Sequence, residues 1–218
     1  MSKTVVYYKS GAKRNFNIVG ELNNRFSKNK RIAKIELGDS VTSIGEDAFY
    51  KCSSLTSVVI PDSVTYIGQA VFAKCTSLTS VVIPDGVTEI NNWTFLGCKS
   101  LTSVTIPDSV TSIDSYAFDG CTSLTSVTIP DSVTKIRDWA FQECTSLTSV
   151  VIPDGVTYIG YKAFAHCTSL TSVTIPDSVE NIEDGVFEGC TNLTSAPIPN
   201  SVREIGVGTF IKPLSKVY

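Results

Sequence analysis

One phrase of 23 residues recurs about eight times along this chain and constrains the fold more than any other feature. The copy at 75–97 reads CTSLTSVVIPDGVTEINNWTFLG, and the next copy begins at Cys98. Burying the seven apolar side chains of one copy contributes about 10–20 kcal/mol, whereas ordering its backbone costs roughly 23–46 kcal/mol. A single copy therefore cannot fold alone. A fixed period of this length predicts a solenoid in which each unit is stabilised by its neighbours.

Each unit contains two short extended segments and a closing turn. LTSVVI has the alternation of a strand, with Leu78, Val81 and Ile83 pointing inward. PDG or PDS then makes a turn, because proline fixes φ and aspartate bonds nearby backbone. VTEI is a second extended piece, and NNWTFLG returns to the next cysteine with Phe95 in the core. Stacked units predict parallel strands about 4.8 Å apart.

The cysteines follow the same period. The seven cysteines form one column in which every gap is 23 residues: Cys52, Cys75, Cys98, Cys121, Cys144, Cys167 and Cys190. Zinc sites need closely spaced cysteine pairs, and disulfide frameworks have uneven spacings. The column therefore predicts a buried ladder of reduced thiols, with partial oxidation as the alternative. Reduced thiols favour a reducing compartment.

The pattern L-T-S-V-x-I-P-x-x-V-x-x-I-x-x-x-x-F-x-x-C resembles the BspA-like class of leucine-rich repeats and stays in phase over residues 32–210. The resemblance implies an α/β, mostly β fold: a right-handed horseshoe or solenoid with a parallel sheet and short helical or turn segments on the convex side. Family members include bacterial and protozoan surface proteins thought to bind host matrix proteins or other cells. The near identity of the copies also fits an engineered consensus sequence.

The repeats define one structural domain with a distinct start. Residues 1–30 form an N-terminal capping segment, a hairpin followed by a degenerate repeat. About eight repeats fill 31–212, and 213–218 is a C-terminal tail. Prolines at 197, 199 and 213 block the last strand edge. With both ends closed in this way, we expect a monomer or weak dimer.

Charge separates the capping segment from the repeats. Residues 1–34 contain nine basic groups and one acid, Glu21, whereas the whole chain has a net charge of −3. The body is therefore acidic, and it lacks the basic, aromatic-rich face of a nucleic-acid-binding protein. No apolar run has the length of a membrane span, and no signal-peptide core is evident. These features favour the cytoplasm, or the cell surface or exterior if an export signal has been removed.

Three large aromatic side chains occupy one position in successive units: Trp93, Tyr116 and Trp139. Stacking places them in a row, and exposed aromatic residues are favoured anchors of protein interfaces. Such a row also suits sugar rings. The alternative is that these rings lie flat over the phenylalanines and cover the core.

The strand offers a second candidate surface of small hydroxyls: Ser80, Ser103, Thr105, Ser126, Thr128 and Ser149. This lattice suits an extended peptide, ordered water of the kind bound by ice-binding solenoids, or plain solvation.

The sequence contains few residues in arrangements suited to metal binding or catalysis. A column of turn aspartates, which includes Asp85 and Asp108, supplies too few oxygens per turn for calcium. His166 precedes Cys167, but adjacent side chains in a turn diverge, so no nucleophile pair is expected. We predict no catalytic residue, no metal site and no cofactor.

The sequence therefore predicts a non-catalytic protein-binding module that acts in interaction or adhesion, with a protein partner or a glycan. The alternative is a structural or assembly protein that acts as a spacer or cap, whose basic N-terminal end docks on an acidic surface.

Overall fold

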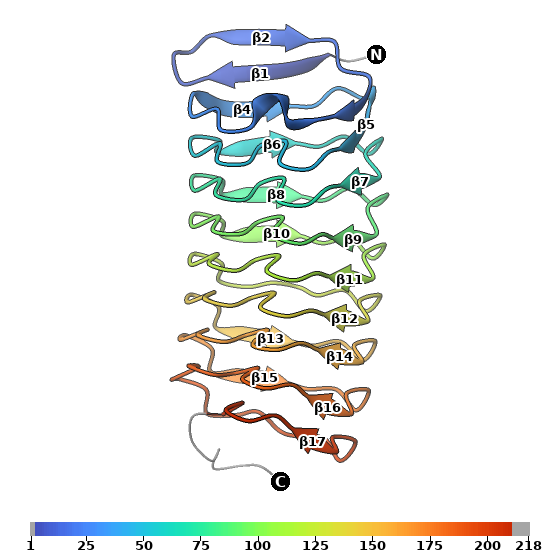
Figure 1. Cartoon of the computed structure of the whole chain (residues 1–218), viewed down its shortest axis with the longest axis vertical. Helices are drawn as coiled ribbons and strands as arrows, with labels where there is room; N and C mark the ends of the chain where they lie inside the picture. The colour runs from blue at the N-terminus through green and yellow to red at the C-terminus, as the bar shows by residue number, and fades with distance from the viewer. Residues whose placement is uncertain (1–2, 211–218) are drawn as a thin grey trace.

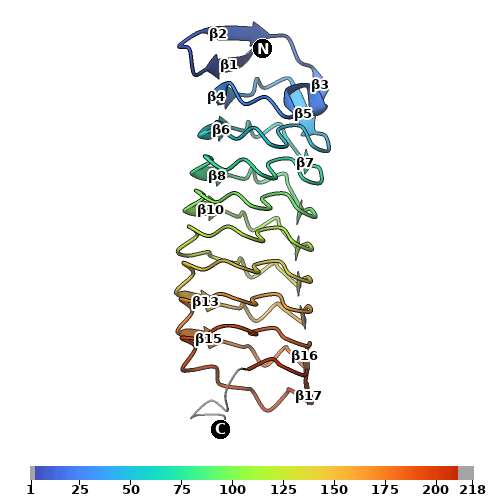
Figure 2. The same ribbon diagram turned by 60° about the vertical axis from the view of Figure 1, so that its left-hand side comes forward.

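The computed structural model describes residues 3–210, and the tail expected at 213–218 lies outside them. The chain winds into a nearly straight stack of coils with the N-terminus at one end (Figures 1 and 2). Helical structure within 3–210 is confined to one 3₁₀ turn, Asn24–Phe26. The strands are therefore connected by turns and not by helices, as expected for a mostly β solenoid.

Two sets of parallel strands run along the stack on different sides of the coils (Figure 1). The first comprises β4 (Ile32–Glu36), β6 (Ser57–Val59), β8 (Ser80–Val82), β10 (Ser103–Thr105), β13 (Ser149–Val151) and β15 (Ser172–Thr174). The second comprises β3 (Gly20–Leu22), β5 (Val41–Ile44), β7 (Tyr66–Ile67), β9 (Glu89–Ile90), β11 (Ser112–Ile113), β12 (Lys135–Ile136), β14 (Tyr158–Ile159), β16 (Asn181–Ile182) and β17 (Glu204–Ile205).

Most strands pair with the equivalent residues of the next unit, although the second set is interrupted between β7 and β9. Ser103 lies opposite Ser80, and Ile113 lies opposite Ile136. The expected alternation is confirmed in the unit that begins at Cys75: Leu78, Val81 and Ile83 are buried. Val82 between them is 66% exposed. The period of 23 residues therefore sets the register of both sheets.

Two strands expected in the first sheet are missing. The last unit keeps only an isolated bridge between Ser172 and Ser195. The segment 126–128 has no strand assignment, so the first sheet is interrupted between β10 and β13. Val104 next to this break and Val127 within it are each 9% exposed, against 2–3% for Val81, Val150 and Val173. The prediction of a strand at Ser126 and Thr128 is wrong. The unit keeps its place because its turns carry hydrogen bonds to the units on both sides.

These turns form a third ladder that the sequence pattern did not predict. The Trp93 amide donates to the Ser115 carbonyl at 3.1 Å, and the Phe95 amide donates to the Ala117 carbonyl at 2.8 Å. The Gly97 amide donates to the Asp119 carbonyl at 2.7 Å, so three bonds join these turns. Successive turns are thereby held at a fixed spacing, and side chains on them must stack.

A continuous column of phenylalanines fills the core. The rings run from Phe26 to Phe210, and consecutive centroids are 5.1–5.9 Å apart. The seven cysteines are buried and unpaired, which confirms the predicted ladder of reduced thiols. Each thiol donates to a phenylalanine carbonyl of the preceding unit at 3.0–3.3 Å. The thiol therefore satisfies a carbonyl group inside the core.

A hairpin covers the N-terminal edge of the first sheet (Figure 1). It consists of β1 (Thr4–Tyr8) and β2 (Lys13–Phe16), and β1 pairs antiparallel with β4. Val6 is fully buried opposite Ile35. β2 is then the outer strand, and its exposed charged side chains discourage pairing with other chains.

Candidate functional site

The three aromatic residues singled out in the sequence form a stacked row. The Tyr116 ring lies 6.2 Å from Trp93 and 4.7 Å from Trp139, with interplanar angles of 21° and 10°. Tyr161 closes the row with its edge against Trp139, at 5.0 Å and 78°. The ring faces are thus directed at one another. The alternative in which the rings lie flat over the phenylalanines does not match this geometry.

The row has one open end. The residue equivalent to Trp93 in the preceding unit is Ala70, which is too small to continue the stack. Trp93 is accordingly the most accessible of the three, at 39%, whereas Tyr116 and Trp139 are half-buried. The row therefore presents ring edges along its length and one Trp93 face at its end.

These residues have left-handed backbone. Trp93, Tyr116 and Trp139 have φ values of 58°, 58° and 54°. The same turn position carries glycine in two later units, Gly185 and Gly208, at φ 65° and 71°. A non-glycine residue in this conformation costs about 1–2 kcal/mol. Asp47, Ala70 and Lys162 share this conformation at the same position, with φ values of 52–57°, so the left-handed turn belongs to the repeat itself and the aromatic side chains are what distinguishes these three units.

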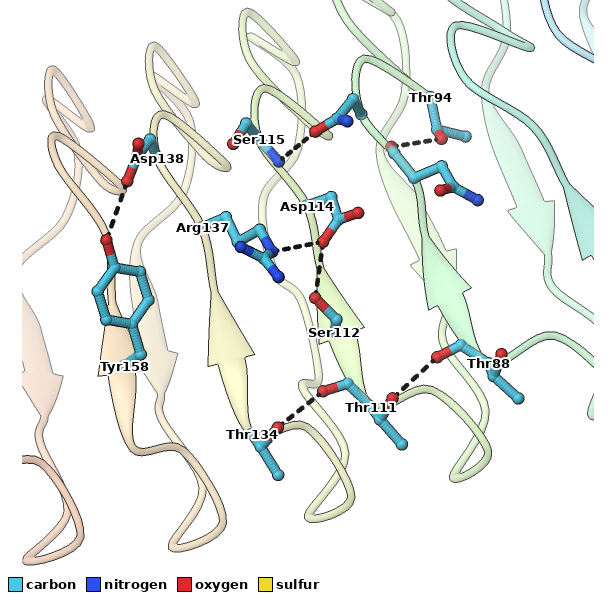
Figure 3. Close-up of polar contacts among 12 residues, drawn as sticks. Thr88, Thr94, Thr111, Ser112, Asp114, Ser115, Thr134, Arg137, Asp138 and Tyr158 are labelled. Atoms are coloured by element: carbon cyan, nitrogen blue, oxygen red, sulfur yellow. Dashed lines mark hydrogen bonds and ion pairs between the residues drawn. The ribbon is translucent and has the colours of Figure 1, made fainter.

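Residues that lie next to the row in sequence make polar contacts with one another, several of which Figure 3 shows. The Arg137 Nε donates to Asp114 Oδ1 at 2.9 Å, and the Ser112 hydroxyl donates to the same oxygen at 2.7 Å. Asn92 Oδ1 accepts the Ser115 amide at 3.0 Å. These contacts hold charged and amide groups in fixed positions beside the rings, where they can donate to or accept from a partner.

Asp138 directly precedes Trp139, as Asn92 directly precedes Trp93. Asp138 accepts the Tyr161 amide at 3.0 Å and the Tyr158 hydroxyl at 3.3 Å (Figure 3). Burial raises the pKa of the Tyr116 hydroxyl, and the charges of Asp119 and Asp138 raise it further. Tyr116 is therefore a neutral hydrogen-bond donor at physiological pH.

The second candidate surface lies on the first sheet. Its side chains are exposed at every predicted position: Ser80, Ser103, Thr105, Ser126, Thr128 and Ser149. Val82 and Val151 on the same face are 66% and 67% exposed. This face is smooth and mostly composed of small side chains, with isolated apolar groups that a partner could cover.

The structure does not bring the two candidate surfaces together. The serines project from the first sheet, whereas the aromatics lie on the turns that follow the second-sheet strands. Comparison of the repeats identified the positions around Trp93 that differ between units, but it did not predict the contacts among those residues. Sequence alone does not mark Arg137, Asp114 and Asp138 as site residues, because each of them pairs with a residue about one unit away.

No described residue suggests a metal or a membrane-spanning helix. Within 3–210, no three histidine, cysteine or acidic side chains gather into a possible metal site. Over the same range, no helix has the length and apolar character to cross a bilayer.

Fold and repeat pattern define a leucine-rich-repeat solenoid. The family model described as "BspA type Leucine rich repeat region (6 copies)" matches residues 21–148 and 111–215. The chain therefore belongs to the BspA-type leucine-rich-repeat family, as the sequence resemblance predicted. Proteins of this class typically serve as interaction modules rather than enzymes.

Solved structures agree with this assignment. The leucine-rich-repeat protein TpLRR of T. pallidum is 30% identical, with a TM-score of 0.62, over 95% of this chain and 84% of that chain. The pneumococcal vaccine antigen PcpA shares the fold at 17% identity and a TM-score of 0.52, over 83% of this chain and 60% of that one. No protein of curated function matches the sequence.

Proposed function

We propose that this chain is a non-catalytic protein-binding module whose partner docks on the row of Trp93, Tyr116 and Trp139. The supporting observation is that three large aromatics stack on one another in consecutive units, at a turn position where other units carry aspartate, alanine, lysine or glycine. Aromatic anchors bordered by fixed polar groups are typical of interface hot spots. Membership of an interaction family supports the same function.

The orientation of the rings favours a protein over a glycan. A sugar stacks on an aromatic face, and the faces in this row are directed at neighbouring rings. Only Trp93 has a face directed away from the row, on the side of Ala70. Ring edges with hydrogen-bond donors nearby instead suit the mixed polar and apolar side chains of a protein partner.

A phage-displayed library of random linear peptides tests this proposal. Peptides would be enriched on the wild-type chain and then measured against the triple variant Trp93→Gly, Tyr116→Gly and Trp139→Gly. Glycine suits this backbone, as Gly185 and Gly208 show, so the fold should persist. We expect the enriched peptides to bind the triple variant at least about tenfold more weakly.

Tyr66 supplies the matched control, because it is 47% exposed in β7 but does not belong to the row. Tyr66→Ser should leave peptide affinity unchanged. If the enriched peptides bind the triple variant as well as the wild-type chain, the row is not the interface. Circular dichroism and thermal melting would establish that each variant is folded.

A further inference from the structure

The N-terminal cap contains a hollow of about 570 Å³ that the proposed function does not use. It is lined by Tyr8, Lys9, Ser10, Ala12, Arg14, Asn29 and Arg31. These residues come from β1, β2 and the turn between them and from the segment just before β4, so two parts of the chain form its walls. Its volume lies within the range typical of small-molecule sites.

Backbone hydrogen bonds fix both walls. The Lys9 amide donates to the Arg31 carbonyl at 2.9 Å, which ties the hairpin turn to the opposite wall. The Arg31 amide donates to Asn29 Oδ1 at 3.0 Å, and the Tyr8 amide donates to the Ala12 carbonyl at 2.9 Å. The positions from which the charged side chains project are therefore set before any ligand binds.

Three cations surround this hollow without a counter-ion. No carboxylate lines it. The ion pairs found within residues 3–210 leave out Lys9, Arg14 and Arg31. The Arg14 guanidinium lies 6.0 Å from the centre of the Tyr8 ring, which holds it near the hollow. Like charges brought together in this way repel one another, and an anion would relieve the repulsion.

The type of cation points to a particular anion. A guanidinium offers a planar fork of donors, whereas an ammonium is a compact point charge. A carboxylate has two oxygens and one charge, so it satisfies one guanidinium. A phosphate or sulfate ester has three free oxygens in a tetrahedral arrangement and can accept from all three cations. The hollow also has room for the group that carries the ester, with Ser10, Asn29 and Tyr8 as polar partners.

We propose that this hollow binds a phosphate or sulfate ester carried on a sugar. This site is independent of the aromatic row and lies on a different part of the molecule. The acidic body repels such ligands, so binding is confined to the capping segment.

Calorimetric titration at low ionic strength tests the proposal with four probes: glucose 6-phosphate, glucose 6-sulfate, glucose and a hexaglutamate peptide. Glucose 6-phosphate, glucose 6-sulfate or both should bind, glucose should not, and hexaglutamate should bind at least about tenfold more weakly than the better ester. The preferred ester identifies the source of the ligand. Affinity should fall as salt is added.

Two triple variants of equal net charge provide the comparison. Lys9→Gln, Arg14→Gln and Arg31→Gln should weaken ester binding at least about tenfold. Lys13→Gln, Lys28→Gln and Lys30→Gln remove three exposed charges from the same end but outside the hollow, and should leave binding within about threefold. Arg14→Lys with Arg31→Lys keeps the charge but loses the forks, and should give an intermediate loss.

Several outcomes would overturn the proposal. Equal losses in the two glutamine triples would assign binding to diffuse charge. Hexaglutamate binding as tight as the better ester would indicate an acidic protein surface instead, and no ester binding at all would refute the site. The glycine triple at Trp93, Tyr116 and Trp139 should bind the ester normally, so failure of one proposal leaves the other intact.

Discussion

Asp119 is a half-buried carboxylate on the turns, and its environment opposes ionisation. Burial and the charge of Glu143 raise its pKa from an ordinary value of 3.8 to about 6, while the charge of Lys74 acts in the opposite direction. The folded chain therefore binds this proton more tightly than the unfolded chain. The stabilisation from protonated Asp119 is complete below about pH 4 and is lost as pH rises to about 6.

Asp119→Asn should consequently stabilise the protein at neutral pH. We expect a gain of about 1–2 kcal/mol at pH 7.5, reduced from the full shift because the group is partly solvated, and no gain near pH 3.5. Urea denaturation midpoints at the two pH values measure the difference. Glu89→Gln changes net charge equally from an exposed strand position and serves as the control. A gain that is as large in acid as at neutral pH would contradict this account.

The cysteines show what could be predicted for single residues. Their constant spacing was sufficient to predict burial in the reduced state, because a column of small apolar side chains has one place in a solenoid. Their hydrogen bonds could not be predicted. The acceptor of the Cys121 thiol is the Phe95 carbonyl at 3.2 Å, and its availability depends on how two turns are oriented.

Among structural elements, the turn around each phenylalanine holds the repeats together. Left-handed backbone recurs two residues after the phenylalanine, at Lys74, Gly97, Gly120 and Glu143 among others. The strands were predictable because alternation in sequence reports burial directly. The hydrogen-bond ladder of the turns was not predictable. Lysine, glutamate and glycine occupy one column and share a left-handed backbone, but lysine and glutamate have no intrinsic preference for it.

Glycine should therefore be preferred to alanine at position 143. Both Glu143→Gly and Glu143→Ala remove the charge near Asp119, but only glycine relieves a φ of 55°. We expect Glu143→Gly to be about 0.5–1 kcal/mol more stable than Glu143→Ala. Chemical denaturation of the two variants gives this difference. At Lys135 in β12 the order should reverse, since glycine weakens a strand; the same order at both positions would argue against backbone strain.

For the whole molecule, stacking distributes stability along one dimension. The solenoid was predictable from the period, and the family from the residue pattern within each repeat. The break in the first sheet at 126–128 was not predictable, because that unit has the same strand sequence pattern as its neighbours. Hydrogen bonds between turns and packing in the phenylalanine column hold this unit in place. Local loss of strand pairing therefore does not interrupt the stack.

Loss of a central phenylalanine should interrupt it. Phe118 is fully buried, with Phe95 and Phe141 rings each 5.1 Å away. Phe118→Ala should cost about 3–5 kcal/mol and uncouple the two halves of the solenoid. Phe187→Ala, nearer the C-terminal end, should remove similar packing but loosen only the last units.

Hydrogen exchange followed by mass spectrometry distinguishes these cases. Faster exchange on both sides of residue 118 in Phe118→Ala, but only beyond about residue 164 in Phe187→Ala, is the pattern that nearest-neighbour stacking requires. Uniform acceleration along the whole chain in both variants would instead indicate a single cooperative unit.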